Sequence, residues 1–101
     1  MLIVIGRIVV EEGAVDGVRD ALHTMERETR KEAGCLSYAF ATEINEPTTV
    51  RIIEQWESMA ALESHFHSAH MAAFGVAIGG LAPKSIDIKC YEVAGEVALP
   101  G

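Results

Sequence analysis

Residues 35–57 read CLSYAFATEINEPTTVRIIEQWE, and this stretch decides the fold. Its first nine residues alternate large and small side chains, which is the period of a strand with one buried face. The segment 45–47 is typical of a turn, and residues 49–57 continue as a run rich in β-branched side chains. We therefore expect residues 35–43 and 49–57 to pair as a β-hairpin.

The elements on either side of the hairpin follow from the same kind of pattern. Residues 2–10 are rich in Ile and Val and apolar on both faces, which predicts a central strand. Residues 14–33 carry apolar side chains at helical spacing and predict one amphipathic helix. Residues 58–78 predict two consecutive helical pieces, and the alternation over 85–93 predicts a last strand.

The order strand, helix, strand, strand, helix, strand predicts an α+β fold of the ferredoxin-like, split βαβ type, with strands one and three in the centre of an antiparallel sheet. A chain of 101 residues fits one domain, so we expect a single domain over 1–101, with its core over 2–93 and a short tail over 94–101. Cys35 and Cys90 would lie on opposite edge strands, too far apart for a disulfide within one chain.

Alternation also sorts the strand residues into two faces, because both helices must cover the same side of the sheet. Glu54 and Trp56 fall on the covered side. A carboxylate in such surroundings must be paired or protonated, and a carboxyl group whose pKa is shifted by burial is a candidate acid or base. The other residues expected on the covered face are Val4, Gly6, Ile8, Leu36, Tyr38, Phe40, Val50, Ile52, Ile86 and Ile88.

The opposite face of the sheet is too apolar for open water, so we expect a second copy of the chain to cover it. The protein would then be a homodimer. The apolar residues of this face are Ile3, Ile5, Val9, Ala39, Ala41, Ile53 and Tyr91.

Charge and hydropathy argue against several partners. Eight Lys and Arg residues stand against 15 Asp and Glu residues, a net charge of −7 that disfavours binding to nucleic acid and to anionic membranes. The first apolar run is too short for a signal peptide, and the longest uncharged stretch, residues 70–83, is too short to span a bilayer. We therefore expect a cytoplasmic protein.

Five short motifs lie in order along the chain: Gly34-Cys35-Leu36-Ser37-Tyr38, Glu46-Pro47, Glu54-Gln55-Trp56-Glu57-Ser58, Ala61-Leu62-Glu63-Ser64-His65 and His70-Met71-Ala72-Ala73-Phe74. Together they resemble the antibiotic biosynthesis monooxygenase (ABM) domain family, and within it the small bacterial quinol monooxygenases, over roughly residues 2–93. The resemblance implies a ferredoxin-like dimer whose two sheets pack into an α/β-barrel.

The resemblance further implies a monooxygenase that oxidises a small electron-rich quinol or phenol with O₂, using neither metal nor flavin, in a pocket between sheet and helices. A general base removes a phenolic proton, and the anion can pass an electron to O₂ directly. His65 and His70 match the histidines of the family and are base candidates, because imidazole titrates near neutrality. Glu54 could orient an imidazole or act itself. The candidate substrate-binding residues are Trp56, Tyr38, Gly6 and Phe74.

Two other functions would use the same pocket: a small-molecule isomerase and a non-catalytic ligand-binding dimer. Each candidate residue also has a purely structural interpretation. Trp56 and Tyr38 could simply be core residues, His65 could hydrogen-bond a neighbouring loop, and Glu54 could pair with an arginine or a helix N-terminus. The sequence leaves these alternatives open.

No cofactor is expected. His65, His67 and His70 look like a metal cluster, but residues two apart on a helix diverge, and the sequence offers no carboxylate or cysteine that would complete the set. Haem-degrading relatives of the fold use a strand-one asparagine, whereas the first strand here carries Gly6 and Arg7.

Overall fold

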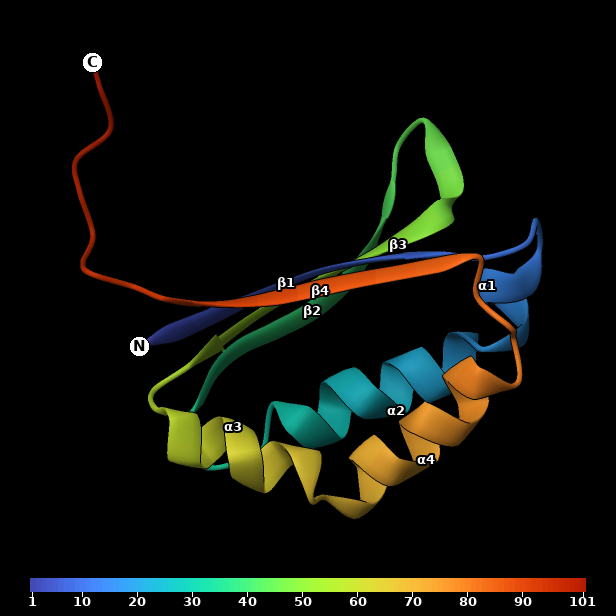
Figure 1. Ribbon diagram of the computed structural model, residues 1–101, viewed down its shortest axis with the longest axis horizontal. Helices are drawn as coiled ribbons and strands as arrows, with labels where there is room; N and C mark the ends of the chain where they lie inside the picture. Colours follow the sequence, from blue (N-terminus) through green and yellow to red (C-terminus); the bar gives the residue numbers. More distant parts are fainter.

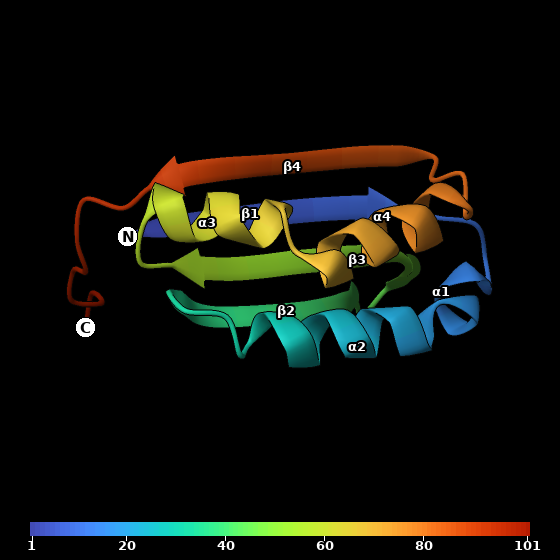
Figure 2. The ribbon, with the colours of Figure 1, turned by 90° about the horizontal axis from the view of Figure 1, so that it is seen from below.

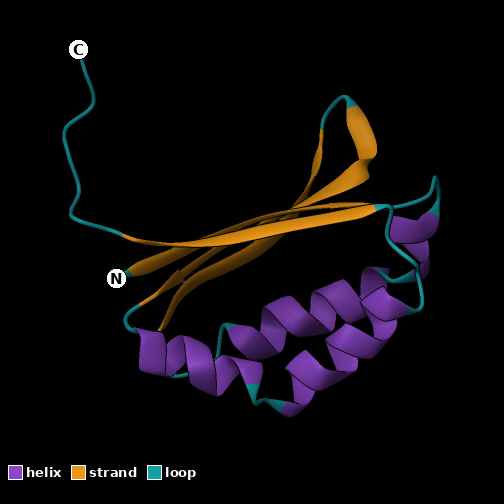
Figure 3. Ribbon diagram, viewed as in Figure 1, coloured by secondary structure: helices purple, strands orange, loops and turns teal.

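The computed structural model, which describes residues 1–101, consists of one antiparallel four-stranded sheet with all helices on one of its faces (Figures 1 and 3). The strand order is β2-β3-β1-β4, so the first and third strands are central. This confirms the expected ferredoxin-like arrangement. The strands are β1 (Leu2–Val9), β2 (Cys35–Glu43), β3 (Glu46–Trp56) and β4 (Ser85–Glu92), and the helices are α1 (Ala14–Gly17), α2 (Arg19–Thr29), α3 (Met59–Phe66) and α4 (Ala69–Gly79).

The expected single helix over 14–33 is wrong, because the structure divides it into α1 and α2. The break lies at Val18, whose φ of −120° and ψ of 12° are not helical. Gly17 and Val18 are poorer helix formers than Ala or Leu, and no side chain caps either helix at this point. Helix α2 then ends at Thr29, and residues 30–34 turn the chain toward β2.

The start of β2 also differs from simple alternation. Cys35 pairs with Trp56 and Ser37 pairs with Gln55, so two residues of β2 are opposite one residue of β3, which is the pattern of a β-bulge. The expectation that Leu36 lies on the covered face is therefore wrong: the bulge leaves its side chain half-exposed. Cys35 packs against the main core instead.

The helices cover the sheet unevenly. Figure 2 shows α3 and α4 in front of β1 and β3, α2 along β2, and β4 beyond the helices. Ile86 and Ile88 share the helix side of the sheet with Ile8 and Gly6, yet 55% and 49% of their surfaces are exposed. They lie on the expected face of the sheet, but the helices do not fully cover that face at β4, because no helix packs over this edge strand. The main core comprises Leu2, Val4, Met25, Tyr38, Trp56, Leu62 and Phe74.

The face of the sheet opposite the helices is uncovered within one chain and carries large apolar side chains among charged ones. Ile5, Ile53 and Tyr91 each expose about half of their surface, with Ile53 at 50%. Cys35 and Cys90 lie on the two edge strands, as expected. None of the helices combines the length and the apolar character that crossing a membrane requires.

We propose that a second copy of the chain covers this open sheet face. Sedimentation should give twice the chain mass of 10.9 kDa. The change Ile53→Glu should convert the dimer to monomer, because the new charge would be desolvated in the interface. The matched control is Val76→Glu on α4, where 79% of the side chain is exposed on the other side of the molecule, and it should leave the dimer intact. A native protein that sediments as a monomer at micromolar concentration would contradict the proposal.

Candidate active site

The last residues of β3 bring a carboxyl group and an indole ring into the core. Glu54 is opposite Val4 on one neighbouring strand and Tyr38 on the other, and its side chain is buried on the helix side of the sheet. Nε1 of Trp56, which is fully buried, donates a hydrogen bond to Glu54 Oε1 at 2.8 Å. The two residues that sequence analysis singled out on this strand are therefore directly joined.

Burial raises the pKa of Glu54. Loss of solvation is the largest cause, and the negative charge of Glu32 acts in the same direction. The hydrogen bond from Trp56 and the proximity of His65 oppose the increase but do not cancel it. A carboxyl group with this balance favours its neutral, hydrogen-bond-donating form more than an ordinary glutamate does.

Helix α3 directs His65 onto the same part of the core. The helix begins after Ser58, whose hydroxyl oxygen accepts a hydrogen bond from the Ala61 amide at 3.2 Å. The two buried side chains of this helix are those of Leu62 and His65, which are three residues apart and so lie on the same face. The His65 ring lies 4.9 Å from the Trp56 ring between centroids, at an angle of 39°. Its second aromatic neighbour is Tyr38, with centroids 5.7 Å apart.

A residue that sequence analysis missed, Glu32, fixes the orientation of His65. Glu32 Oε2 lies 2.6 Å from His65 Nδ1 and 3.0 Å from His70 Nε2, so one carboxylate oxygen holds both imidazole rings. The position of Glu32 along the sequence does indicate that its side chain needs a partner. A carboxylate just beyond the C-terminus of α2 is unfavourable next to the negative end of the helix dipole unless it has a partner.

The turn that presents Glu32 depends on Gly34. Its φ of +84° is left-handed, and a Cβ atom at this position would lie 2.5 Å from the Ala61 Cβ atom. The Gly34 carbonyl also accepts a hydrogen bond from the Glu57 amide at 2.8 Å. Glycine thus allows the chain leaving α2 to pass close to α3, which brings the Glu32 carboxylate within reach of His65.

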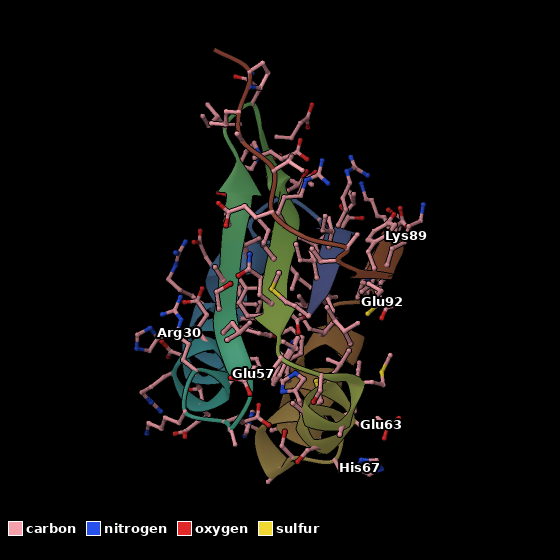
Figure 4. The ribbon with its side chains drawn as sticks, turned by 90° about the vertical axis from the view of Figure 1, so that its left-hand side faces the viewer. Arg30, Glu57, Glu63, His67, Lys89 and Glu92 are labelled. Atoms are coloured by element: carbon pink, nitrogen blue, oxygen red, sulfur yellow. The ribbon has the colours of Figure 1, made fainter.

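The break between α3 and α4 brings His70 to the same carboxylate. Ser68 caps α4 by accepting a hydrogen bond from the Met71 amide at 3.2 Å, and its hydroxyl donates to the His65 carbonyl at 2.7 Å. His67, between the two site histidines, does not join them. Its Nδ1 atom lies 2.8 Å from the Glu63 carbonyl oxygen, and Figure 4 shows both residues pointing away from the sheet.

The contact with Glu32 determines the chemical state that His65 can offer. A carboxylate oxygen accepts a hydrogen, so Nδ1 of His65 carries the proton, and Nε2 of the neutral ring keeps its lone pair. Nε2 makes no hydrogen bond with the protein, and the ring forms part of a cavity wall. A carboxylate orients an imidazole in this way in Ser-His-Asp triads, where the histidine acts as a general base.

The cavity, of about 320 Å³, lies between the sheet and helices α3 and α4. Tyr38, Glu54 and His65 supply its polar side chains, and nearly all of the rest is apolar. Burial raises the pKa of the Tyr38 hydroxyl, with the charge of Glu54 as the next cause, so this group stays protonated and can donate. The other lining residues are Val4, Ile8, Ile52, Phe66, Met71, Phe74, Gly75, Ile78, Gly79, Pro83, Ile86 and Ile88.

The remaining candidates occupy different places. Phe74 lines the cavity and stacks on Phe40, with ring centroids 5.4 Å apart. Trp56 lies behind His65 and does not line the cavity. Gly6 does not line it either, because the side chains of Ile52 and Ile88 close over it: a Cβ atom at Gly6 would lie 3.1 Å from Ile88 and 3.3 Å from Ile52.

A second hollow, of about 380 Å³, lies between α1, α2 and the hairpin. Its polar residues are Arg19, His23, Glu26 and Thr42, and it contains none of the candidates from sequence analysis. We therefore place the site in the smaller cavity, where the aromatic rings, the buried carboxyl group and the oriented imidazole meet.

One expectation about metals is wrong. The sequence suggested that no carboxylate completes a set with the histidines, but Glu32, His65 and His70 bring their ligand atoms within 4.8 Å of one another. Glu32 is distant in sequence from both histidines, so their spacing could not reveal it. Two imidazoles and one carboxylate are a donor set that divalent transition metals accept.

Known proteins resemble this chain in sequence. An uncharacterized protein from Synechocystis is 29% identical over 93 residues, covering 92% of this chain and 63% of the relative. The probable quinol monooxygenase YgiN of Escherichia coli is 38% identical over 58 residues, covering 50% of this chain and 56% of the relative. The matches thus span about three fifths of the length of these relatives.

Solved structures share the fold over nearly the whole chain. A protein from Deinococcus radiodurans superposes with a TM-score of 0.91 at 24% identity, and the match covers both chains completely. PA3566 from Pseudomonas aeruginosa gives a TM-score of 0.81 at 29% identity over 92% of this chain and 94% of the other. The family model for antibiotic biosynthesis monooxygenase matches residues 1–76. This chain belongs to the antibiotic biosynthesis monooxygenase family.

Proposed function

We propose that this protein is a monooxygenase that oxidises a small electron-rich aromatic alcohol, a quinol or a phenol, with O₂. The observation that carries the proposal is the His65 imidazole, held by Glu32 through Nδ1 and forming part of the wall of a largely apolar cavity. Family membership and the similarity to a probable quinol monooxygenase support the same reaction class.

The chemistry starts with proton removal. Nε2 of His65 takes the phenolic proton, and Glu32 stabilises the imidazolium that forms. The phenolate passes one electron to O₂, and the resulting radical pair combines to form a carbon–oxygen bond. Loss of water then leaves a carbonyl on the ring. The overall change, phenol + O₂ → quinone + H₂O, balances because the ring supplies all four electrons, so no external reductant is required.

The other site residues bind and orient the substrate. The Tyr38 hydroxyl, which stays protonated, can donate a hydrogen bond to a substrate oxygen, and so can the Glu54 carboxyl group in its protonated form, which burial favours by raising its pKa. Phe74 offers an aromatic face in the cavity wall. Trp56 holds both Glu54, through its indole hydrogen, and His65, through ring contact. It therefore acts as a positioning residue in this proposal.

The test of the reaction class is O₂ consumption with a panel of quinols and phenols, on protein stripped of metal and flavin. We expect uptake of one O₂ per substrate and incorporation of one ¹⁸O atom from ¹⁸O₂ into the product. Proton exchange into a substrate without O₂ uptake would instead identify an isomerase. Binding of these compounds without any turnover would identify a ligand-binding protein.

The assignment of His65 as the base predicts how its removal affects turnover. His65→Ala should lower turnover by about 10²–10⁴-fold, the usual range for loss of a general base. His67→Ala is the matched control, because His67 directly follows helix α3 and its ring hydrogen-bonds only with the Glu63 carbonyl, and it should retain native turnover. Turnover and circular dichroism are compared for both variants. A folded His65→Ala protein with native turnover would exclude the assignment.

The raised pKa of Glu54 predicts how the stability of the folded protein depends on pH. The folded state holds the Glu54 proton more tightly than the unfolded chain does, so native stability falls as pH rises from about 4.5, the ordinary glutamate value, through the higher folded pKa. Glu54→Gln stays neutral throughout and keeps an oxygen that can accept from Trp56. The melting temperature of Glu54→Gln minus that of the native protein should therefore be larger at pH 8 than at pH 4.

The control for this measurement is the exposed Glu57, at the end of the same strand. The difference in melting temperature between Glu57→Gln and the native protein should stay constant over the same pH range. A constant difference for Glu54→Gln as well would show that its carboxyl group ionises as easily in the folded protein as in the unfolded chain.

A further inference from the structure

We propose that Glu32, His65 and His70 form a binding site for one divalent transition-metal ion, and that the bound ion removes His65 from the reaction. The ligand atoms are Glu32 Oε2, His65 Nδ1 and His70 Nε2, which all lie within 4.8 Å of one another. Two imidazoles and one carboxylate are the ligand set of several three-residue zinc sites, in which a fourth position is left to water.

The geometry needs only a small adjustment. Two ligands about 2.0–2.1 Å from a tetrahedral Zn²⁺ ion are about 3.3 Å apart. The oxygen of Glu32 is already 3.0 Å from the His70 nitrogen and 2.6 Å from the His65 nitrogen. To admit the ion, side-chain rotations must move the Glu32 oxygen about 0.3 Å further from the His70 nitrogen and about 0.7 Å further from the His65 nitrogen. They must also bring the two nitrogens, which lie within 4.8 Å of each other, to a similar separation.

The charge of the cluster also favours a cation. Glu32 is mostly buried, and its only ion-pair partners are the two imidazoles, because no Lys or Arg side chain reaches it. Burying a carboxylate charge that no Lys or Arg side chain pairs with is costly, and a divalent ion would offset this cost. The site is also accessible: 19% of the His70 side chain and 16% of the Glu32 side chain are exposed, whereas His65 lies behind them.

Metal binding requires no net loss of protons. In the hydrogen-bonded state Nδ1 of His65 and Nε2 of His70 carry hydrogens that point at Glu32. When the ion takes these two nitrogens, each ring keeps one hydrogen on its other nitrogen. For His65 this is Nε2, the atom that has the free lone pair in the metal-free state. The ion therefore converts the proposed base into a hydrogen-bond donor.

This inhibition rests on the proposed function, whereas metal binding itself does not. Metal binding and inhibition are therefore measured in separate experiments. Calorimetric titration of chelator-treated protein with Zn²⁺ should give one ion per chain. O₂ uptake with an active quinol should fall in proportion to the bound Zn²⁺. Uptake that is unchanged at full occupancy would overturn the inhibition, and failure of every aromatic compound to support uptake would overturn the proposed function while the calorimetry still decides the site.

Substitutions of the proposed ligand residues test where the ion binds. His70→Gln should bind Zn²⁺ more than about 100-fold more weakly, because losing a ligand costs more than the roughly 10–100-fold that outer-shell partners contribute. Glu32→Gln should show a similar loss. His67→Gln is the matched control and should bind like the native protein, because its ring contacts only the Glu63 carbonyl. Native affinity in both His70→Gln and Glu32→Gln would overturn the assignment.

A measurement on the native chain removes any dependence on how the variants fold. The protein contains four histidines, His23, His65, His67 and His70, so their ring nitrogen signals can be assigned individually by NMR. Addition of one equivalent of Zn²⁺ should shift the signals of His65 and His70 and leave those of His23 and His67 in place. Shifts at His23 or His67 alone, or no shift at all, would contradict the proposed site.

Discussion

One carboxylate oxygen, Glu32 Oε2, joins three segments of the helix layer: the turn that follows α2, the end of α3 and the first turn of α4. A mostly buried carboxylate is stable only with hydrogen-bond donors, and here both donors are imidazoles. The relative positions of these segments are therefore coupled to the orientation of His65. That orientation in turn decides which nitrogen lies beside the cavity and which contact the ring makes with Trp56.

The second determinant of the site is the uneven cover of the sheet. Helices α2, α3 and α4 lie over β1, β2 and β3, while β4 lies outside them. The cavity lies between the sheet and helices α3 and α4, extends to β4, and has a polar side formed by Tyr38, Glu54 and His65. A cavity with this distribution holds an apolar ring while its hydroxyl group faces the donors and the imidazole.

Most of the fold could be predicted from the sequence because alternation and helical periodicity are strong in this chain. The first strand of the hairpin and the inward position of Glu54 and Trp56 follow from period-2 patterns, and the two central strands follow from runs rich in β-branched side chains. The break at Val18 and the bulge at Leu36 could not be read in this way, because periodicity alone does not show where a backbone leaves regular geometry. The predicted helix therefore joined α1 and α2, and Leu36 was wrongly expected on the covered face at the start of β2.

The site was only partly predictable, for a related reason. Tyr38, Glu54, Trp56 and His65 stand out by residue type on regular elements, and the structure brings these four together. Glu32 lies in a turn whose path depends on the left-handed Gly34 and on the close approach of Ala61. Such a partner is specified by tertiary contacts and not by spacing along the chain. Gly6, a candidate substrate-binding residue, does not line the cavity because two isoleucines meet over it.

The exposed side of β4 has a consequence for how this protein can change over evolutionary time. Ile86 and Ile88 shape the outer wall of the cavity, yet they belong to an edge strand and pack under no helix. Replacing them alters the room available to a bound molecule at little cost to folding, because the core loses few contacts. The groups proposed to carry out the reaction lie on β2, β3 and α3 and in the turn after α2. Selectivity and reactivity are thus encoded in separate segments, so one can diversify under selection while the other is retained.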